Sequence, residues 1–168
     1  MTLLNPYPDI CYFHTDIVSE DNKKLHSLEI LWSNQFKSDQ RRLEYISGRR
    51  CAHLAMEQAG FFNIPILTNR DRSPNWPSSI TGSITHSSSD AAALIVGPGH
   101  LVQGVGIDLE NLKRSVNPNI SSHVLNPEEQ KHWFTQKSTS LQNLKIIFSI
   151  KECIFKCFYP KHKVYLGF

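Results

Sequence analysis

The 168-residue sequence predicts an α+β fold with two long helices and several short strands. Two apolar patterns with helical spacing, at about residues 39–59 and 140–158, indicate the helices. Between them, short apolar runs separated by turn residues indicate strands of an antiparallel sheet. A chain of this length forms one domain, or two very small ones, and can bury a substantial core.

The composition is that of an ordinary globular protein, with 40% hydrophobic and 20% charged residues. The longest clean apolar run, 91–96, is too short to span a bilayer. Residues 1–13 lack a basic stretch followed by an apolar one, so we expect no secretory signal and a cytoplasmic location. The net charge of +3 does not indicate a nucleic-acid-binding protein, and it suits a local pocket for a phosphorylated small molecule.

The four cysteines contain no CxxC pair, so we expect free buried thiols. Cys153, Cys157 and His162 could be drawn as ligands of a soft metal, but a fourth ligand is missing and the spacing matches no zinc pattern. The other two cysteines, Cys11 and Cys51, lie far away in the sequence.

The first third of the chain predicts a strand around 11–18 and then a long helix. Ser38 and Asp39 are both fair N-caps for this helix, which stops at Gly60. Gly48 inside it costs about 1 kcal/mol relative to alanine, unless close packing or a ligand needs the space.

Four arginines crowd this helix: Arg41, Arg42, Arg49 and Arg50. One interpretation is a solvated basic face, which is the usual meaning of such a run. The other is that Arg49, next to Gly48, reaches a phosphate. Taken alone, the pattern favours the solvated face.

The middle of the chain predicts short strands separated by turns. The run 61–67 contains Pro65 and reads as an edge strand or an extended segment, followed by a loop at 69–79. An antiparallel meander is expected at 80–87, 91–96 and 101–109, with a turn at 97–99. His86 ends the first of these strands, and a single histidine is more often structural than a ligand.

Asn126, Pro127 and Glu129 mark the start of another helix, because an N-cap residue is followed by proline and then by acids in the first turn. Glu129 sits where the acid of a capping box would sit. The last helix covers about 140–158 and is expected to be halted by Pro160.

The apolar residues of the last helix predict a broad buried side. They are Leu141, Leu144, Ile147, Phe148, Ile154, Phe155 and Phe158. Glu152 and Lys156 form an i, i+4 pair, which on a solvent face is worth only a few tenths of a kcal/mol. The apolar residues around this pair argue against a purely solvated role.

Asp108 and Glu110 would stand side by side on one face of a strand. Two carboxylates so close repel each other unless a cation lies between them, and Mg²⁺ prefers such oxygen ligands. Glu152 is the natural third oxygen donor, and Lys151 and Lys156 lie beside it. Walker A, Rossmann, HExxH and nucleophile-elbow motifs are absent, so these residues fit metal-assisted transfer better than covalent catalysis.

These motifs resemble those of a known family. The stretches Gly106-Ile-Asp108-Leu-Glu110 and Phe148-Ser-Ile-Lys151-Glu152-Cys-Ile-Phe-Lys156 resemble the (V/I)G(I/V)D and (F/W)SxKExxxK signatures of the Sfp-type phosphopantetheinyl transferases. Trp76-Pro, Gly82-Ser-Ile-Thr-His86 and the arginine-bearing helix around Arg49 are similar to the enterobactin synthetase component D branch. The resemblance runs from about Arg41 to Tyr159.

The resemblance implies a fold and a reaction. The fold would be a pseudo-twofold pair of α/β halves, here about 1–100 and 101–168 of a single domain, with the C-terminal strands of the second half missing. The reaction would transfer 4′-phosphopantetheine from coenzyme A to a serine of an acyl, aryl or peptidyl carrier protein. A monomer serving nonribosomal siderophore synthesis is expected.

The resemblance also assigns roles to residues. Asp108, Glu110 and Glu152 would hold Mg²⁺ against the pyrophosphate. Lys156 and Lys151 would lie against the phosphates.

The remaining roles concern coenzyme A and the carrier serine. Arg49 and His86 would bind coenzyme A, with the histidine near the 3′-phosphate. Glu129 would be the general base for the serine, in competition with its capping role.

Two alternatives stay open: a shortened, weakly active or inactive relative that still binds coenzyme A or a carrier domain, and a general Mg²⁺-dependent phosphohydrolase. All the expected site side chains are present, which favours activity, whereas the shortened C-terminus favours the binding alternative.

Overall fold

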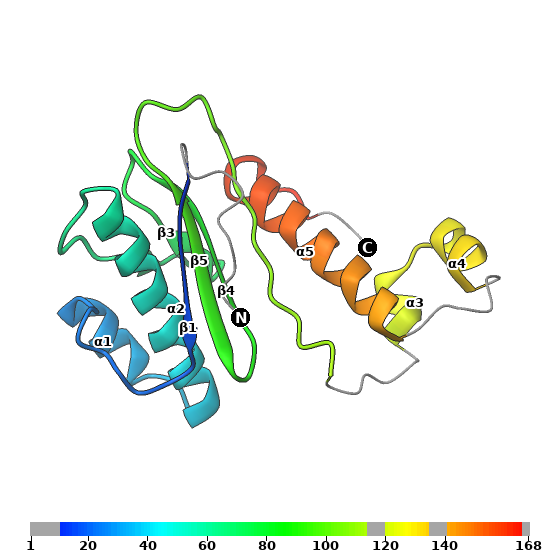
Figure 1. Ribbon diagram of the computed structural model, residues 1–168, viewed down its shortest axis with the longest axis horizontal. Helices are drawn as coiled ribbons and strands as arrows, with labels where there is room; N and C mark the ends of the chain where they lie inside the picture. Colours follow the sequence, from blue (N-terminus) through cyan, green and yellow to red (C-terminus); the bar gives the residue numbers. More distant parts are fainter. Residues whose placement is uncertain (1–10, 114–119, 135–140, 166–168) are drawn as a thin grey trace.

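The computed structural model describes residues 11–113, 120–134 and 141–165 (Figure 1). The predicted α+β class is confirmed, because helices and a small antiparallel sheet are both present. The elements are β1 (Cys11–Ile17), α1 (Ser27–Ser33), α2 (Asp39–Gln58), β2 (Leu67–Thr68), β3 (Pro74–Asn75), β4 (Thr81–His86), β5 (Asp90–Val96), α3 (Ser121–Val124), α4 (Pro127–Phe134) and α5 (Leu141–His162).

The main sheet has the order β1-β5-β4, and both pairings are antiparallel. The predicted strands at β1, β4 and β5 are confirmed, as is the turn after β5, where Gly99 has a φ of +90°. The predicted strand at 101–109 is wrong, since this segment has no regular secondary structure. The third strand of the sheet is β1, from the other end of the chain.

Helix α2 forms as its sequence predicts and covers one face of the sheet (Figure 1). The Ser38 side chain accepts a hydrogen bond from the backbone N–H of Arg41, and Gly60 ends the helix with a φ of +84°. Gly48 is needed for close packing, because a Cβ there would lie 2.8 Å from Ile84 Cγ2 on β4.

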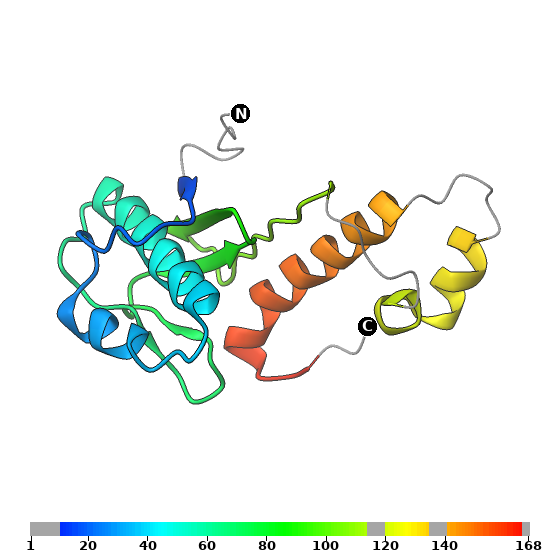
Figure 2. The same cartoon turned by 90° about the horizontal axis from the view of Figure 1, so that it is seen from below.

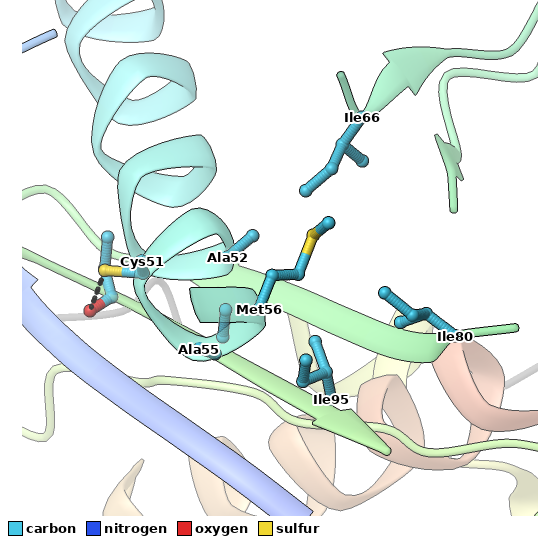
Figure 3. Close-up of a cluster of buried hydrophobic side chains, with 9 residues drawn as sticks. Cys51, Ala52, Ala55, Met56, Ile66, Ile80 and Ile95 are labelled. Carbon is cyan, nitrogen blue, oxygen red and sulfur yellow. Dashed lines mark hydrogen bonds between the residues drawn. The ribbon is translucent and has the colours of Figure 1, made fainter. Parts of the chain in front are cut away.

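The main core lies between α2, β5 and the segment that leads to β2 (Figure 3). Met56 on α2, Ile66 just before β2, and Ile95 on β5 are fully buried. Smaller side chains, including Ala52 and Ala55, let the helix approach the sheet closely.

The sheet lies between α2 and α5 in both views (Figures 1 and 2). Ile84 faces α2, so its neighbours Ser83 and Thr85 point to the opposite face. There they meet the segment 104–110, on which α5 packs. The face opposite α2 therefore brings β4, this segment and α5 together.

Two predictions for α5 are wrong. The helix continues through Pro160 to His162, because a proline in the last turn removes only one helical hydrogen bond. Its predicted apolar side is also only partly buried: Leu144 packs with Val124, whereas Ile154 and Phe158 are exposed. The predicted start at Ser140 lies outside the described residues.

After Val96, the described residues form helices α3 to α5 and no strand. The arrangement of two similar halves therefore stays a prediction. Of the helices in the described ranges, none is both long and apolar enough to cross a membrane.

Candidate active site

The centre of the candidate site is an ion pair between segment 104–110 and α5. Lys156 Nζ lies 2.6 Å from Asp108 Oδ1 and 3.3 Å from the carbonyl oxygen of Ile107. The side chain of Asp108 is 8% exposed and that of Lys156 is 25% exposed. Salt screens a pair this buried less than a surface pair. The structure thus brings together the motifs 106–110 and 148–156, which the sequence predicts to act together.

Two glycines allow this approach. A Cβ at Gly106 would overlap the backbone carbonyl oxygen of Cys153, and a Cβ at Gly104 would overlap that of Cys157. Both obstacles are helix backbone, which cannot move aside as a side chain can. The glycines of the first motif therefore let the segment lie directly against α5.

Glu152 supplies a second carboxylate near the pair. Burial raises the pKa of Glu152, the Lys156 charge lowers it, and the Asp108 charge raises it again. Asp108 Oδ2 is buried and has no hydrogen-bond partner. Carboxylate oxygens are the ligands that Mg²⁺ prefers, so the unpartnered Oδ2 of Asp108 and the nearby Glu152 have the chemistry of a Mg²⁺ site.

Glu110 is exposed, and the segment that carries it is not the strand that would align it with Asp108. Within the described ranges, no group of three or more His, Cys, Asp or Glu side chains is arranged to hold a metal ion. The four cysteines are free, as predicted, but only Cys11 and Cys51 are buried. Burial raises the pKa of the Cys51 thiol to about 12, which keeps it protonated.

His86 lies at the end of β4, next to an acid that the sequence reading missed. Its Nδ1 is 3.5 Å from Glu44 Oε2 on α2. Burial lowers the pKa of His86 and outweighs the opposing effect of Glu44, while the charge of Lys156 lowers it further. His86 is therefore neutral at pH 7 and lies within electrostatic reach of the Asp108–Lys156 pair.

The solvated basic face is the wrong interpretation for half of the α2 arginines, because Arg49 and Arg50 are buried. Arg50 forms an ion pair with Asp16 at 3.1 Å and fixes β1 to α2. Arg49 lies over the ring of Tyr45 and 3.9 Å from the buried Glu29, and its Nε has no hydrogen-bond partner.

Glu129 performs the capping role that its position predicts. Its carboxylate accepts from Asn126 N at 2.8 Å, and its N–H donates to Asn126 Oδ1 at 2.9 Å. The same carboxylate lies 2.6 Å from Lys151 Nζ. This hydrogen bond lowers the pKa of Glu129, so the group is ionised at neutral pH.

A cavity of about 280 Å³ lies next to the ion pair, between β4, the loop before it and the end of α5. Lys156, Lys161 and Lys163 line it, and two of these lysines are paired with carboxylates: Lys156 with Asp108 and Lys163 with Asp71. The Trp76 ring forms part of the wall and rests on Gly82, where a Cβ would lie 2.6 Å from the ring.

Sequence reasoning missed Glu44, Thr85 and the two terminal lysines of the cavity. Thr85 bonds to Asp108, and its position two residues after Ser83 on one strand face was the available signal. Lys161 and Lys163 follow Pro160, where the helix was expected to have ended.

Comparison with known proteins identifies the family of the chain. Residues 35–96 match the model of the 4′-phosphopantetheinyl transferase N-terminal domain, and residues 104–168 match that of the 4′-phosphopantetheinyl transferase superfamily. The chain is 35% identical to the 4′-phosphopantetheinyl transferase PptT of Mycobacterium tuberculosis, over 76% of this chain and 56% of the relative.

Other relatives give the same result. The chain is 28% identical to the 4′-phosphopantetheinyl transferase Npt of Nocardia iowensis, over 77% of this chain and 57% of Npt. It is 27% identical to enterobactin synthase component D of Salmonella typhi, over 84% of this chain and 61% of that protein. The chain thus spans somewhat more than half the length of these relatives. Because family models match residues 35–96 and 104–168 and named relatives agree with them, the chain belongs to the 4′-phosphopantetheinyl transferase superfamily.

Proposed function

We propose that this protein transfers 4′-phosphopantetheine from coenzyme A to a serine hydroxyl of a carrier protein. The serine oxygen forms a bond to the phosphorus that bears the pantetheine arm, the bond from this phosphorus to the bridging oxygen breaks, and adenosine 3′,5′-bisphosphate leaves. The observation that carries the proposal is the shielded Asp108–Lys156 pair beside a lysine-lined cavity, in a chain of this superfamily.

Asp108 and Glu152, with Glu110 as the third acid, would hold Mg²⁺. The ion would neutralise charge that develops on the pyrophosphate. Support comes from the unpartnered Asp108 Oδ2 and from the raised pKa of Glu152. Lys156 already neutralises one oxygen of Asp108 and would contact the phosphates as a point charge.

His86 and Arg49 are proposed to bind coenzyme A. A phosphate beside the neutral His86 imidazole would favour its protonation, so binding would turn the side chain into a cation. Arg49 is 5% exposed and is paired with Glu29, so a rearrangement would have to free it before it could contact coenzyme A.

Glu129 is the proposed acceptor of the serine proton, directly or through water. Its carboxylate is ionised at neutral pH and can therefore accept a proton. The hydrogen bond from Lys151 makes it a weak base, so Lys151 would have to turn toward the phosphates for Glu129 to accept. This coupling would link phosphate binding to proton removal.

The proposed partner is a carrier domain of a siderophore synthetase, since several relatives are named enterobactin synthase component D. The proposed setting is a monomer in the cytoplasm. A second candidate, a protein that binds coenzyme A or a carrier domain without transfer, is favoured by the absence of a three-acid metal group in the described ranges.

One experiment separates these candidates. Purified protein is mixed with apo carrier protein, coenzyme A and Mg²⁺, and the mass gain of the carrier is followed, while calorimetry measures coenzyme A binding. We expect transfer that EDTA abolishes. Binding without transfer selects the second candidate, and coenzyme A hydrolysis without a carrier indicates a phosphohydrolase.

The matched variants are Lys156→Met and Lys24→Met. Lys24 forms an exposed ion pair with Glu57 on α2, and neither residue lines the cavity, so its replacement should leave transfer intact. Lys156→Met should abolish transfer. Equal activity of the two variants would contradict the proposed role of Lys156.

A further inference from the structure

We propose that Thr85 is a positioning residue, which fixes the backbone of residues 107–109 on β4 and orients the Asp108 carboxylate. The effect on catalysis expected of Thr85 rests on the proposed function, whereas its positioning of the backbone does not. Thr85 is 3% exposed and lies on the sheet face that meets segment 104–110.

The Thr85 hydroxyl uses its full bonding capacity within the protein. It donates to Asp108 Oδ1 at 3.1 Å and accepts from Leu109 N at 3.1 Å and from Lys156 Nζ at 3.4 Å. A hydroxyl has one donor and two acceptor positions, so all three are occupied. Thr85 therefore contacts the Asp108 carboxylate, the Lys156 ammonium group and the backbone of the candidate site at once.

A second hydroxyl repeats the contact one step earlier. Ser83 Oγ accepts from Ile107 N at 3.1 Å, and Ser83 is buried. Ser83 and Thr85 are two residues apart, as are Ile107 and Leu109, so the segment runs parallel to β4 in a fixed register. Side-chain oxygens thus replace the backbone carbonyls that a neighbouring strand would offer.

This register places Asp108 opposite Lys156. The glycines at 104 and 106 lie against α5, while the hydroxyls hold the other side of the same segment. Loss of the Thr85 hydroxyl would leave the Leu109 amide and Asp108 Oδ1 each short of one partner, in addition to the unpartnered Asp108 Oδ2.

The test compares Thr85→Val, which removes the hydroxyl at nearly constant volume, with Thr85→Ser, which keeps it. The control is Thr15→Val, because Thr15 lies on β1, which β5 separates from β4, and its hydroxyl donates to Ala91 O and not to segment 104–110. Hydrogen exchange of the Leu109 amide, Mn²⁺ binding by electron paramagnetic resonance, and kcat with KM for coenzyme A are measured.

We expect Thr85→Val to lower Leu109 protection and kcat each about tenfold, to weaken Mn²⁺ binding, and to change KM little. Thr85→Ser and Thr15→Val should behave like the wild type. Normal Leu109 protection in Thr85→Val would overturn the proposal, as would equal losses in Thr85→Ser, since the methyl group would then be responsible.

If Thr85→Val does not fold, Ser83→Ala gives the decision, because normal Ile107 protection in that variant would overturn the register argument. A wild-type protein without transfer activity would end the proposed function. The exchange measurements would still judge the positioning role.

Discussion

Asp108 is the residue on which the candidate site depends most. Its Oδ1 atom is paired with Lys156, whereas its Oδ2 atom has no hydrogen-bond partner. Asp108→Asn keeps the size and removes the charge, so we expect turnover to fall by at least about a hundredfold, as when a preorganised electrostatic group is removed. Mass spectrometry of the carrier protein measures this turnover.

The control for this prediction is Asp90→Asn, at the exposed start of β5. It should retain turnover and a melting temperature near that of the wild type. Full activity of Asp108→Asn with Mg²⁺ present would show that the carboxylate interpretation is wrong.

At the residue scale, the sequence predicted which residues form the candidate site better than it predicted what surrounds each side chain. The pairing of Asp108 with the Lys156 motif followed from residue types. The burial of Arg49 and Arg50 did not, because their partners Glu29 and Asp16 lie in segments that no periodicity connects to α2. A charge pattern along one helix does not show which distant acids will meet it.

At the element scale, strands and helices with local signals were predictable. The segment 101–109 was not, because its alternating pattern is typical of a strand although two buried hydroxyls replace the neighbouring backbone. The burial of the apolar side of α5 was overestimated for a related reason. Periodicity shows which face of a helix can be buried, and not whether another element covers it.

Gly106 tests the contact between segment 104–110 and α5. Gly106→Ala places a methyl group on the Cys153 carbonyl, so we expect a loss of about 1–3 kcal/mol of stability and a drop in turnover as Asp108 moves from Lys156. Gly97→Ala is the control, since its Cβ would be 3.7 Å from the nearest atom. Equal stabilities of the two variants, measured by urea unfolding, would contradict the close contact.

The loop between β2 and β3 is tied to the end of α5 by Asp71. Its Oδ2 accepts from Lys163 Nζ at 2.8 Å and from the Tyr159 hydroxyl at 3.2 Å. The hydrogen bond from Lys163 holds the pKa of Asp71 well below its ordinary value of 3.8. The unfolded state therefore binds more protons than the folded state in this range, and the stabilisation is present above pH 3.8 and lost as the pH falls through the depressed pKa.

Asp71→Asn should accordingly lower the melting temperature at pH 7, and its difference from the wild type should close in strong acid. Calorimetry between about pH 7 and pH 2 measures this difference. Glu57→Gln, which breaks the exposed pair with Lys24, is the control and should change little. A difference that is independent of pH would exclude the charge as its cause.

At the scale of the whole molecule, α5 exposes a row of apolar side chains. Ile146, Ile150, Ile154 and Phe158 are between 45% and 54% exposed and follow each other every four residues. A double replacement of Ile150 and Ile154 by Gln should reduce binding of the dye ANS and cost less than about 1 kcal/mol. Leu144→Ala, in the buried cluster with Val124, should instead cost about 2–5 kcal/mol.

The ion pair between Lys156 and Asp108 also has a kinetic consequence. It joins residues 48 positions apart, and the Thr85–Lys156 contact joins residues 71 apart. Such contacts close long loops, whose entropy must be lost before the contact forms. The sheet with α2 can form first, and the site assembles only when α5 docks. Refolding should therefore recover the core before the site, and substitutions at Lys156 should speed unfolding more than they slow folding.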